Sequence, residues 1–217
     1  MPLANVIKGR NVKVEVGATY LGAPISVTAV SQANPGVATA TAHGLADGVV
    51  GFFQNVLGMV QLDQQAVRID APAANTFSLQ GLNTIAFPAY SGGQLVTVLT
   101  WLTLAESTAY RIAGGAPEKL DVTTLIDVVR QEENGLLAAS GLEFDTIATT
   151  IPTAALQLIE SAAQAGTKLI FRITLSDGAV RLAYGEPALP GEDVGLGAVG
   201  TGSLGVSVKG YILKLAP

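Results

Sequence analysis

Cysteine is absent from this chain of 217 residues, and histidine and tryptophan occur once each. Without cysteine the chain can form neither a disulfide nor a thiolate metal site, so packing or assembly must hold it together. A single histidine offers no second imidazole for a metal cluster. No stretch reaches the roughly eighteen unbroken apolar residues of a membrane span, and the first residues lack the basic and apolar regions of a signal peptide. We therefore expect a protein made in the cytoplasm, without a membrane segment.

Charge is also scarce. Charged residues make up 13% of the chain, with a formal net charge of −5, whereas hydrophobic residues make up 49%. An acidic balance excludes the basic footprint of a protein that binds nucleic acid or an anionic membrane tightly. So few charges leave neutral or apolar surface, which usually marks contact with partners. Self-association is the first inference.

Residues 34–93 form a nearly uncharged run with a turn signal about every eight to twelve residues, which is typical of a small all-β domain. The flanking sequence carries more charged residues, so we interpret the run as an insertion. We expect an inserted domain at residues 30–93 and a discontinuous host domain at residues 1–29 and 94–217.

The host domain is expected to be mainly β. Alternating or β-branched segments predict strands at residues 11–16, 94–102, 168–175, 179–184 and 203–215. One flanking helix is predicted at about residues 152–165, where Pro152 suits the first turn and Gly166 the C-terminal stop. Residues 120–134 predict a strand followed by an acidic loop, with Asn134-Gly135 as a turn signal, and residues 187–202 predict a mobile loop.

Few residues are candidates for catalysis. His43 precedes a turn and has neither a nucleophile nor a second histidine beside it, so we interpret it as a structural turn residue. The pairs Glu132-Glu133 and Glu192-Asp193 are adjacent on loops, where side chains point apart, which favours a solvated surface over acid–base chemistry.

Other patterns point no more strongly to a site. The aspartates at positions 47, 63 and 70 are too widely spaced for a calcium loop. The Gly-rich residues 195–205 lack the Gly-Lys-Ser/Thr ending and following helix of a phosphate loop. The aromatic residues are dispersed among different strands and favour core or interface packing over a sugar-binding platform. We expect no enzyme activity, no metal and no cofactor.

Two resemblances cover most of the chain. The strand Asp121-Val122-Thr123-Thr124-Leu125, the helix at 152–166, the hairpin at 171–178 and the closing strand at 206–210 follow one another in an order that resembles the major tail tube protein of long-tailed, siphovirus-type bacteriophages. That order extends over roughly residues 9–30 and 94–217. Within the insertion, the segments at 34–35, 41–45, 58–59, 75–77 and 90–93 resemble a small β domain that recurs in phage tail and baseplate proteins.

The resemblance implies a structural virion protein, assembled in the host cytoplasm, with a tail-tube-type β-sandwich or barrel. Six such subunits would form a ring, and rings would stack into a tube around a tape-measure protein and later the DNA. Tail-tip and terminator proteins would be further partners. The inserted domain would sit on the tube exterior, because so many extra residues would obstruct a DNA-wide channel.

Acidic residues have two expected places in such a tube. A lumen lined by carboxylates repels phosphate and lets the duplex slide, so DNA would pass without tight binding. We expect Glu15, Glu106 and Asp121, on strand-like segments, to lie nearer the lumen. Contacts between subunits or rings are expected at the acidic loop residues Glu118, Asp127, Glu132, Glu133, Glu192 and Asp193.

Two other functions stay open at this point. In one, the chain is a tail adhesin or decoration protein whose inserted domain binds cell-surface glycans. In the other, it is a hydrolase of cell-wall or glycan material, which would need a pair of carboxylates in a cleft.

Overall fold

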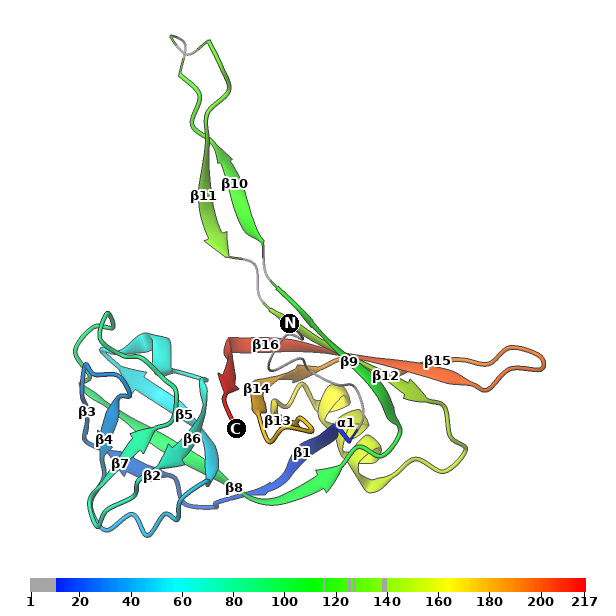
Figure 1. Cartoon of the computed structure of the whole chain (residues 1–217), viewed down its shortest axis with the longest axis horizontal. Helices are drawn as coiled ribbons and strands as arrows, with labels where there is room; N and C mark the ends of the chain where they lie inside the picture. The colour runs from blue at the N-terminus through cyan, green and yellow to red at the C-terminus, as the bar shows by residue number, and fades with distance from the viewer. Residues whose placement is uncertain (1–10, 115, 125, 127, 138–139) are drawn as a thin grey trace, which may run out of the picture.

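The computed structural model describes residues 11–114, 116–124, 126, 128–137 and 140–217. It confirms a mainly β chain with one α-helix (Figure 1). The strands are β1 (Lys13–Tyr20), β2 (Ile25–Val27), β3 (Ala29–Val30), β4 (Val37–Thr39), β5 (Val50–Leu57), β6 (Ala66–Asp70), β7 (Thr76–Leu79), β8 (Gly92–Thr103), β9 (Ser107–Ala113), β10 (Pro117–Asp121), β11 (Glu132–Leu137), β12 (Gly141–Ile147), β13 (Leu169–Thr174), β14 (Val180–Pro187), β15 (Gly191–Asp193) and β16 (Thr201–Leu215). The helix is α1 (Ala154–Ala165), and η1 (Val60–Leu62) is a short 3-10 turn.

One sheet runs through the whole body in the order β3-β4-β7-β6-β5-β8-β1-β13-β14-β16-β12-β9, and β10 pairs with β11 in a sheet of their own. The long strand β8 joins the two parts of the body. Its first half pairs with β5, from Gly92 to Thr97, and its second half pairs with β1, from Val98 to Thr103. The predicted boundary between residues 93 and 94 therefore falls inside a strand that both parts share.

The helix covers one face of the host sheet, which contains β1, β13, β14 and β16. Thr153 caps it by accepting a hydrogen bond from the Leu156 N–H, and Gly166 ends it in the left-handed conformation, with φ 64°. The predicted helix is confirmed, although it begins two residues after Pro152 because Thr153 is the cap. Leu156 and Ile159 on its buried face share a core with sheet residues such as Phe171.

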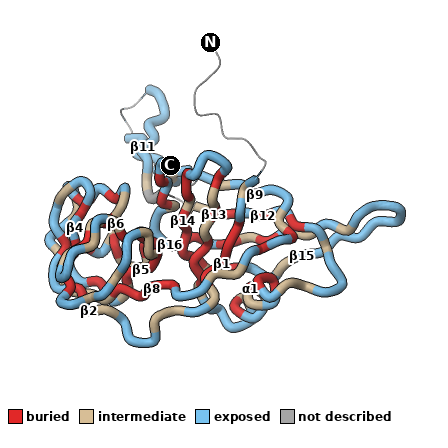
Figure 2. The backbone as a smooth tube through the Cα atoms, turned by 60° about the horizontal axis from the view of Figure 1, so that its bottom comes forward, coloured by how far each residue is buried: buried red, intermediate tan, exposed pale blue. Residues whose placement is uncertain are grey.

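Residues 30–93, the predicted insertion, are called the inserted part. They cover the opposite face of that sheet. Side chains alternate across a strand, so Leu169 and Phe171 of β13 point to the helix, whereas Ile170 points to the other side. Ile170 belongs to a second core, which also contains Phe52 and Phe53 of β5. The central strands thus lie buried between two layers, while the projecting hairpins are exposed (Figure 2). The inserted part is packed on the host sheet over a continuous core.

Strand β16 contributes one face to each core. Val206 and Val208 face the helix core, whereas Leu213 and Leu215, at alternate positions along the strand, face the inserted part. Gly210 sits at an irregularity of the strand with φ 67°, and a Cβ there would lie 2.6 Å from Oε1 of Gln65. Glycine is required because it adopts this conformation without strain and leaves room for Gln65.

Candidate assembly surfaces

A two-stranded arm stands away from the body (Figure 1). It is formed by β10 and β11, which pair from Pro117↔Leu137 to Asp121↔Glu132. The strands β9 and β12, which pair up to Ala113↔Gly141, lead directly into it. The arm is therefore the outer half of one long hairpin whose inner half belongs to the body.

Apolar side chains cluster toward the end of the arm. Ile126 is 90% exposed, Val128 99% and Val129 69%, and Leu120 and Val122 are also exposed. A soluble monomer gains nothing by holding so many aliphatic side chains in water on a thin projection. A patch of this kind is typical of a surface that a partner covers.

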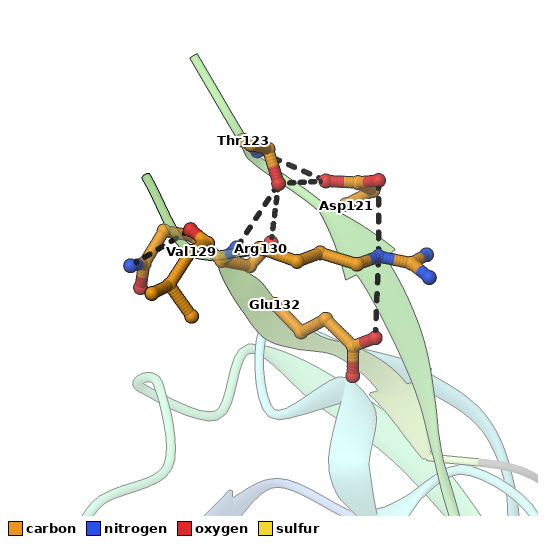
Figure 3. A network of polar contacts seen from close by, with 6 residues as sticks. Asp121, Thr123, Val129, Arg130 and Glu132 are labelled. Carbon is orange, nitrogen blue, oxygen red and sulfur yellow. Dashed lines mark hydrogen bonds and ion pairs between the residues drawn. The ribbon is translucent and has the colours of Figure 1, made fainter. Parts of the chain in front are cut away.

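A polar network holds the base of the arm's tip (Figure 3). Nε of Arg130 lies 3.2 Å from Oδ2 of Asp121 and 3.5 Å from Oε1 of Glu132. The Thr123 N–H donates to Oδ1 of Asp121 at 3.0 Å, and the Thr123 hydroxyl accepts from the Gln131 N–H at 3.0 Å. These contacts join the two strands where their pairing ends. Hydrogen bonds from Thr123, with a smaller effect of Arg130, lower the pKa of the Asp121 carboxyl below its ordinary value.

A second projection is formed by β15 and the start of β16, which pair from Gly191↔Ser203 to Asp193↔Thr201 (Figure 1). The prediction of a loop at 187–202 is wrong for Pro187, for the three residues of β15, and for Thr201 and Gly202, because all of these lie in strands. Its exposed apolar side chains are Leu189, Val194, Leu196 and Val199. The molecule therefore carries two apolar projections.

The sheet also ends in an open edge. Strand β9 pairs with β12 on one side and is the last strand in the order, so within the described residues its other side meets no strand. Its seven residues are mostly exposed or half-buried. Unpaired N–H and C=O groups along such an edge are a template for pairing with another chain.

Glu15 is held inside the subunit. Its side chain lies 2.8 Å from the Arg172 guanidinium and 2.7 Å from Nζ of Lys13, and the residue is 5% exposed. The Arg172 guanidinium also lies over the Trp101 ring, 4.0 Å from its centroid. Two cations and an aromatic ring thus hold one buried carboxylate. Its assignment to the lumen stays a prediction.

Glu106 is buried at the start of the helix. One carboxylate oxygen accepts from the Thr153 N–H at 2.9 Å and the other from the Thr153 hydroxyl at 3.0 Å. A carboxylate at a helix N-terminus is favoured by the helix dipole and by unsatisfied N–H groups there. Glu106 therefore fixes where α1 begins, and its expected lumen position stays a prediction.

The structure distributes the other acidic residues over the two projections. Asp121 and Glu118 lie on β10, Glu132 and Glu133 on β11, and Glu192 and Asp193 on β15. Asp127 lies outside the described residues. Among the described residues, Glu118, Glu133, Glu192 and Asp193 are exposed and lie in no ion pair. Their role in contacts between subunits stays a prediction.

One local pattern in the arm is misleading. Asn134-Gly135 predicts a turn, but the structure places both residues in β11, where Asn134 pairs with Lys119 and accepts a 2.8 Å hydrogen bond from its Nζ. Gly135 lies against the Leu120 side chain. The true turn falls within residues 122–131. The exposed aliphatic residues of that stretch, set among charges and without periodicity, were the available signal for an assembly surface.

His43 has the surroundings of a structural residue. Its Nδ1 accepts from the Leu45 N–H at 3.0 Å, its Nε2 lies 3.3 Å from the Thr76 carbonyl oxygen, and its ring meets Phe77 edge to face. Among the described residues, no group of three or more histidine, aspartate or glutamate side chains is placed to hold a metal ion. In the same part of the chain, none of the helices has the length and apolar character to cross a membrane.

Comparisons with known proteins identify the family of the chain. The model of the family described as phage tail tube protein, TTP, matches residues 57–189. No match was found among curated proteins. Among solved structures, a chain from the virion of a native gene transfer agent particle is similar, with 15% identity and a TM-score of 0.42 over 54% of this chain and 89% of that chain. A structural likeness this distant carries no argument by itself. The family match spans more than half of the chain, which is therefore a member of the phage tail tube protein family and a structural protein of the phage tail.

Proposed function

We propose that this subunit assembles with copies of itself into stacked rings, six to a ring, that form the tube of the phage tail. The exposed aliphatic side chains of the arm are the main support for this proposal. Its exposed aliphatic side chains would each contribute roughly 25 cal/mol for every Å² that a neighbour removes from water. An arm that reaches away from the body can contact a neighbour without disturbing the subunit's own cores.

The open edge of β9 supports ring formation. Its free backbone groups would pair with a strand of the next subunit, and a closed ring would leave no edge exposed. The low charge of the chain, 13% of its residues, suits a subunit whose neighbours cover much of its surface.

The tube would serve as the conduit for DNA delivery into the host cell. A subunit with a net charge of −5 repels phosphate, so the duplex would pass in transit without being bound. A tape-measure protein would occupy the lumen before the DNA, and tail-tip and terminator proteins would close the two ends. The inserted part would lie on the outer wall.

Negative-stain electron microscopy of the concentrated full chain tests the proposal. We expect rings or tubes with a channel wide enough for duplex DNA. Val128→Asp in the arm should abolish them, because it places a charge in the patch that a neighbour would bury. Ile85→Asp is the matched control, since Ile85 is an exposed aliphatic residue of the inserted part. Tubes that form equally well with Val128→Asp, or the absence of tubes for the unaltered chain at every salt concentration, would contradict the proposal.

A further inference from the structure

A cleft lies where the inserted part meets the host sheet. It has two adjoining hollows, one of about 460 Å³ and one of about 200 Å³. Phe52, Gln54, Lys168 and Tyr184 line both of them. We call the combined space the junction cleft. Its walls come from β5 and residues 63–64 of the inserted part, and from β1, β8, β14 and the residues between α1 and β13 in the host domain.

Aromatic rings form the apolar wall of the junction cleft. Phe52 stacks on Tyr184, with ring centroids 4.2 Å apart and planes inclined by 12°. Tyr20 meets Phe52 edge to face at 6.0 Å. Burial, with smaller contributions from Tyr20 and Asp63, raises the pKa of the Tyr184 phenol to about 12, so this hydroxyl keeps its proton. The wall thus combines apolar ring surface with a neutral hydroxyl group.

Polar side chains line the smaller hollow on its other side. They are Gln54, Asn55, Asp63 and Gln64 of the inserted part, with Lys168 of the host domain. The Gln64 side-chain oxygen is buried and has no hydrogen-bond partner among the described residues. A buried acceptor without a donor costs roughly 1–3 kcal/mol, so turning this oxygen into the hollow toward the hydroxyl donor of a ligand would be favoured.

The backbone around this hollow is strained at two positions. Asn55 has φ 55° and Gln64 has φ 59°, and both residues line the same space. Left-handed conformations cost free energy for residues other than glycine and cluster at ligand sites, where the surrounding structure maintains them. Here Asp63 helps to do so, because its Oδ1 accepts from the Val56 N–H at 3.2 Å.

We propose that the junction cleft binds an uncharged saccharide. Amide groups, a carboxylate and a phenol hydroxyl suit a ligand rich in hydroxyl groups, and the half-buried Tyr20 ring beside the stacked Phe52 and Tyr184 suits the apolar C–H groups of a sugar. Asp63 and Lys168 line the smaller hollow together, so their opposite charges disfavour a strongly charged ligand. This site would let an assembled tube contact surface glycans, a role that tube formation does not require.

Saturation-transfer difference NMR on the full chain tests the proposal, with the methyl glycosides of glucose, galactose and N-acetylglucosamine as probes at millimolar concentration. We expect transfer to at least one of them. Lys168→Met and Tyr184→Phe should each weaken that binding by roughly tenfold, as expected for the loss of one hydrogen bond to a ligand. Lys214→Met, at an exposed lysine of β16, is the matched control and should leave binding unchanged.

Unfolding curves of each variant establish that it is folded. The proposal is overturned if none of the three glycosides receives magnetisation, or if folded Lys168→Met and Tyr184→Phe variants bind as well as the unaltered chain. Binding that disappears when subunits assemble into tubes would also overturn it, because a neighbouring subunit would then occupy the cleft.

Discussion

Gln65 of the inserted part holds the backbone of Tyr211 in β16 from both sides. Its Oε1 accepts from the Tyr211 N–H at 2.8 Å, and its Nε2 donates to the Tyr211 carbonyl oxygen at 2.9 Å. Gln65 is 1% exposed, so these bonds are shielded from water. The irregular stretch of β16 at Gly210 leaves its backbone groups without ladder partners, and Gln65 replaces them. One side chain thus joins the inserted part to the host sheet.

Gln65→Ala should destabilise the subunit by about 1–3 kcal/mol, because it removes two partly buried hydrogen bonds to the Tyr211 backbone. Urea unfolding followed by circular dichroism measures the change. Gln164→Ala, at an exposed glutamine of α1, should change the free energy of unfolding by less than about 0.5 kcal/mol. Equal effects of the two substitutions would show that the Gln65 contacts carry no stability.

Glu106→Gln should lower the free energy of unfolding by about 1–2 kcal/mol, since a neutral amide accepts more weakly from Thr153 and loses its interaction with the helix dipole. The same unfolding assay measures this effect. Glu160→Gln, which removes a charge further along the same helix, is the control. If Glu106 instead acts mainly in the lumen, the substitution will leave subunit stability unchanged.

The Asp121 network makes the arm's tip sensitive to acid. Thr123 lowers the pKa of Asp121 relative to its ordinary value of 3.8. Because the pKa of Asp121 is lower in the folded state, the network stabilises the fold at pH values above the ordinary pKa of this carboxyl. This contribution is lost as the pH falls through the folded-state pKa. An NMR titration should give an Asp121 midpoint below 3.8, and Thr123→Val should raise it toward that value. A midpoint unaffected by Thr123→Val would refute the network's role.

The two projections should become ordered on assembly. Gly- and Pro-rich or weakly paired segments often order when they form interfaces. We expect amide hydrogen exchange in residues 114–134 and 187–202 to be slower in tubes than in the free subunit. The buried strand β13 serves as the internal reference, because its protection should be the same in both states. Equal exchange of the projections in subunit and tube would contradict their place between neighbours.

The sequence predicted the body of the fold better than its surfaces. Strand β16 alternates between buried and exposed residues, β13 opens on an apolar run because both of its faces are buried, and α1 has a helical apolar stripe with a glycine stop. The arm has no buried face, so its strands leave no such pattern, and Asn134-Gly135 suggests a turn at the wrong place. The pair Glu15–Arg172 joins positions 157 residues apart. Partners so distant follow from topology, which local patterns do not contain.

Deleting residues 30–93 should damage the subunit itself as well as its outer surface. Val180, Leu182 and Leu213 of the host sheet share the core of the inserted part and would become exposed. Burying an aliphatic side chain contributes about 1.5–3 kcal/mol, so this loss exceeds what a marginally stable domain tolerates. We expect the truncated chain to aggregate, as measured by light scattering. Replacing those three residues with threonine in the truncated chain should restore solubility if exposure is the cause. Tubes that then form would support an exterior position for the inserted part, whereas a soluble but assembly-incompetent chain would show that residues 30–93 take part in tube contacts.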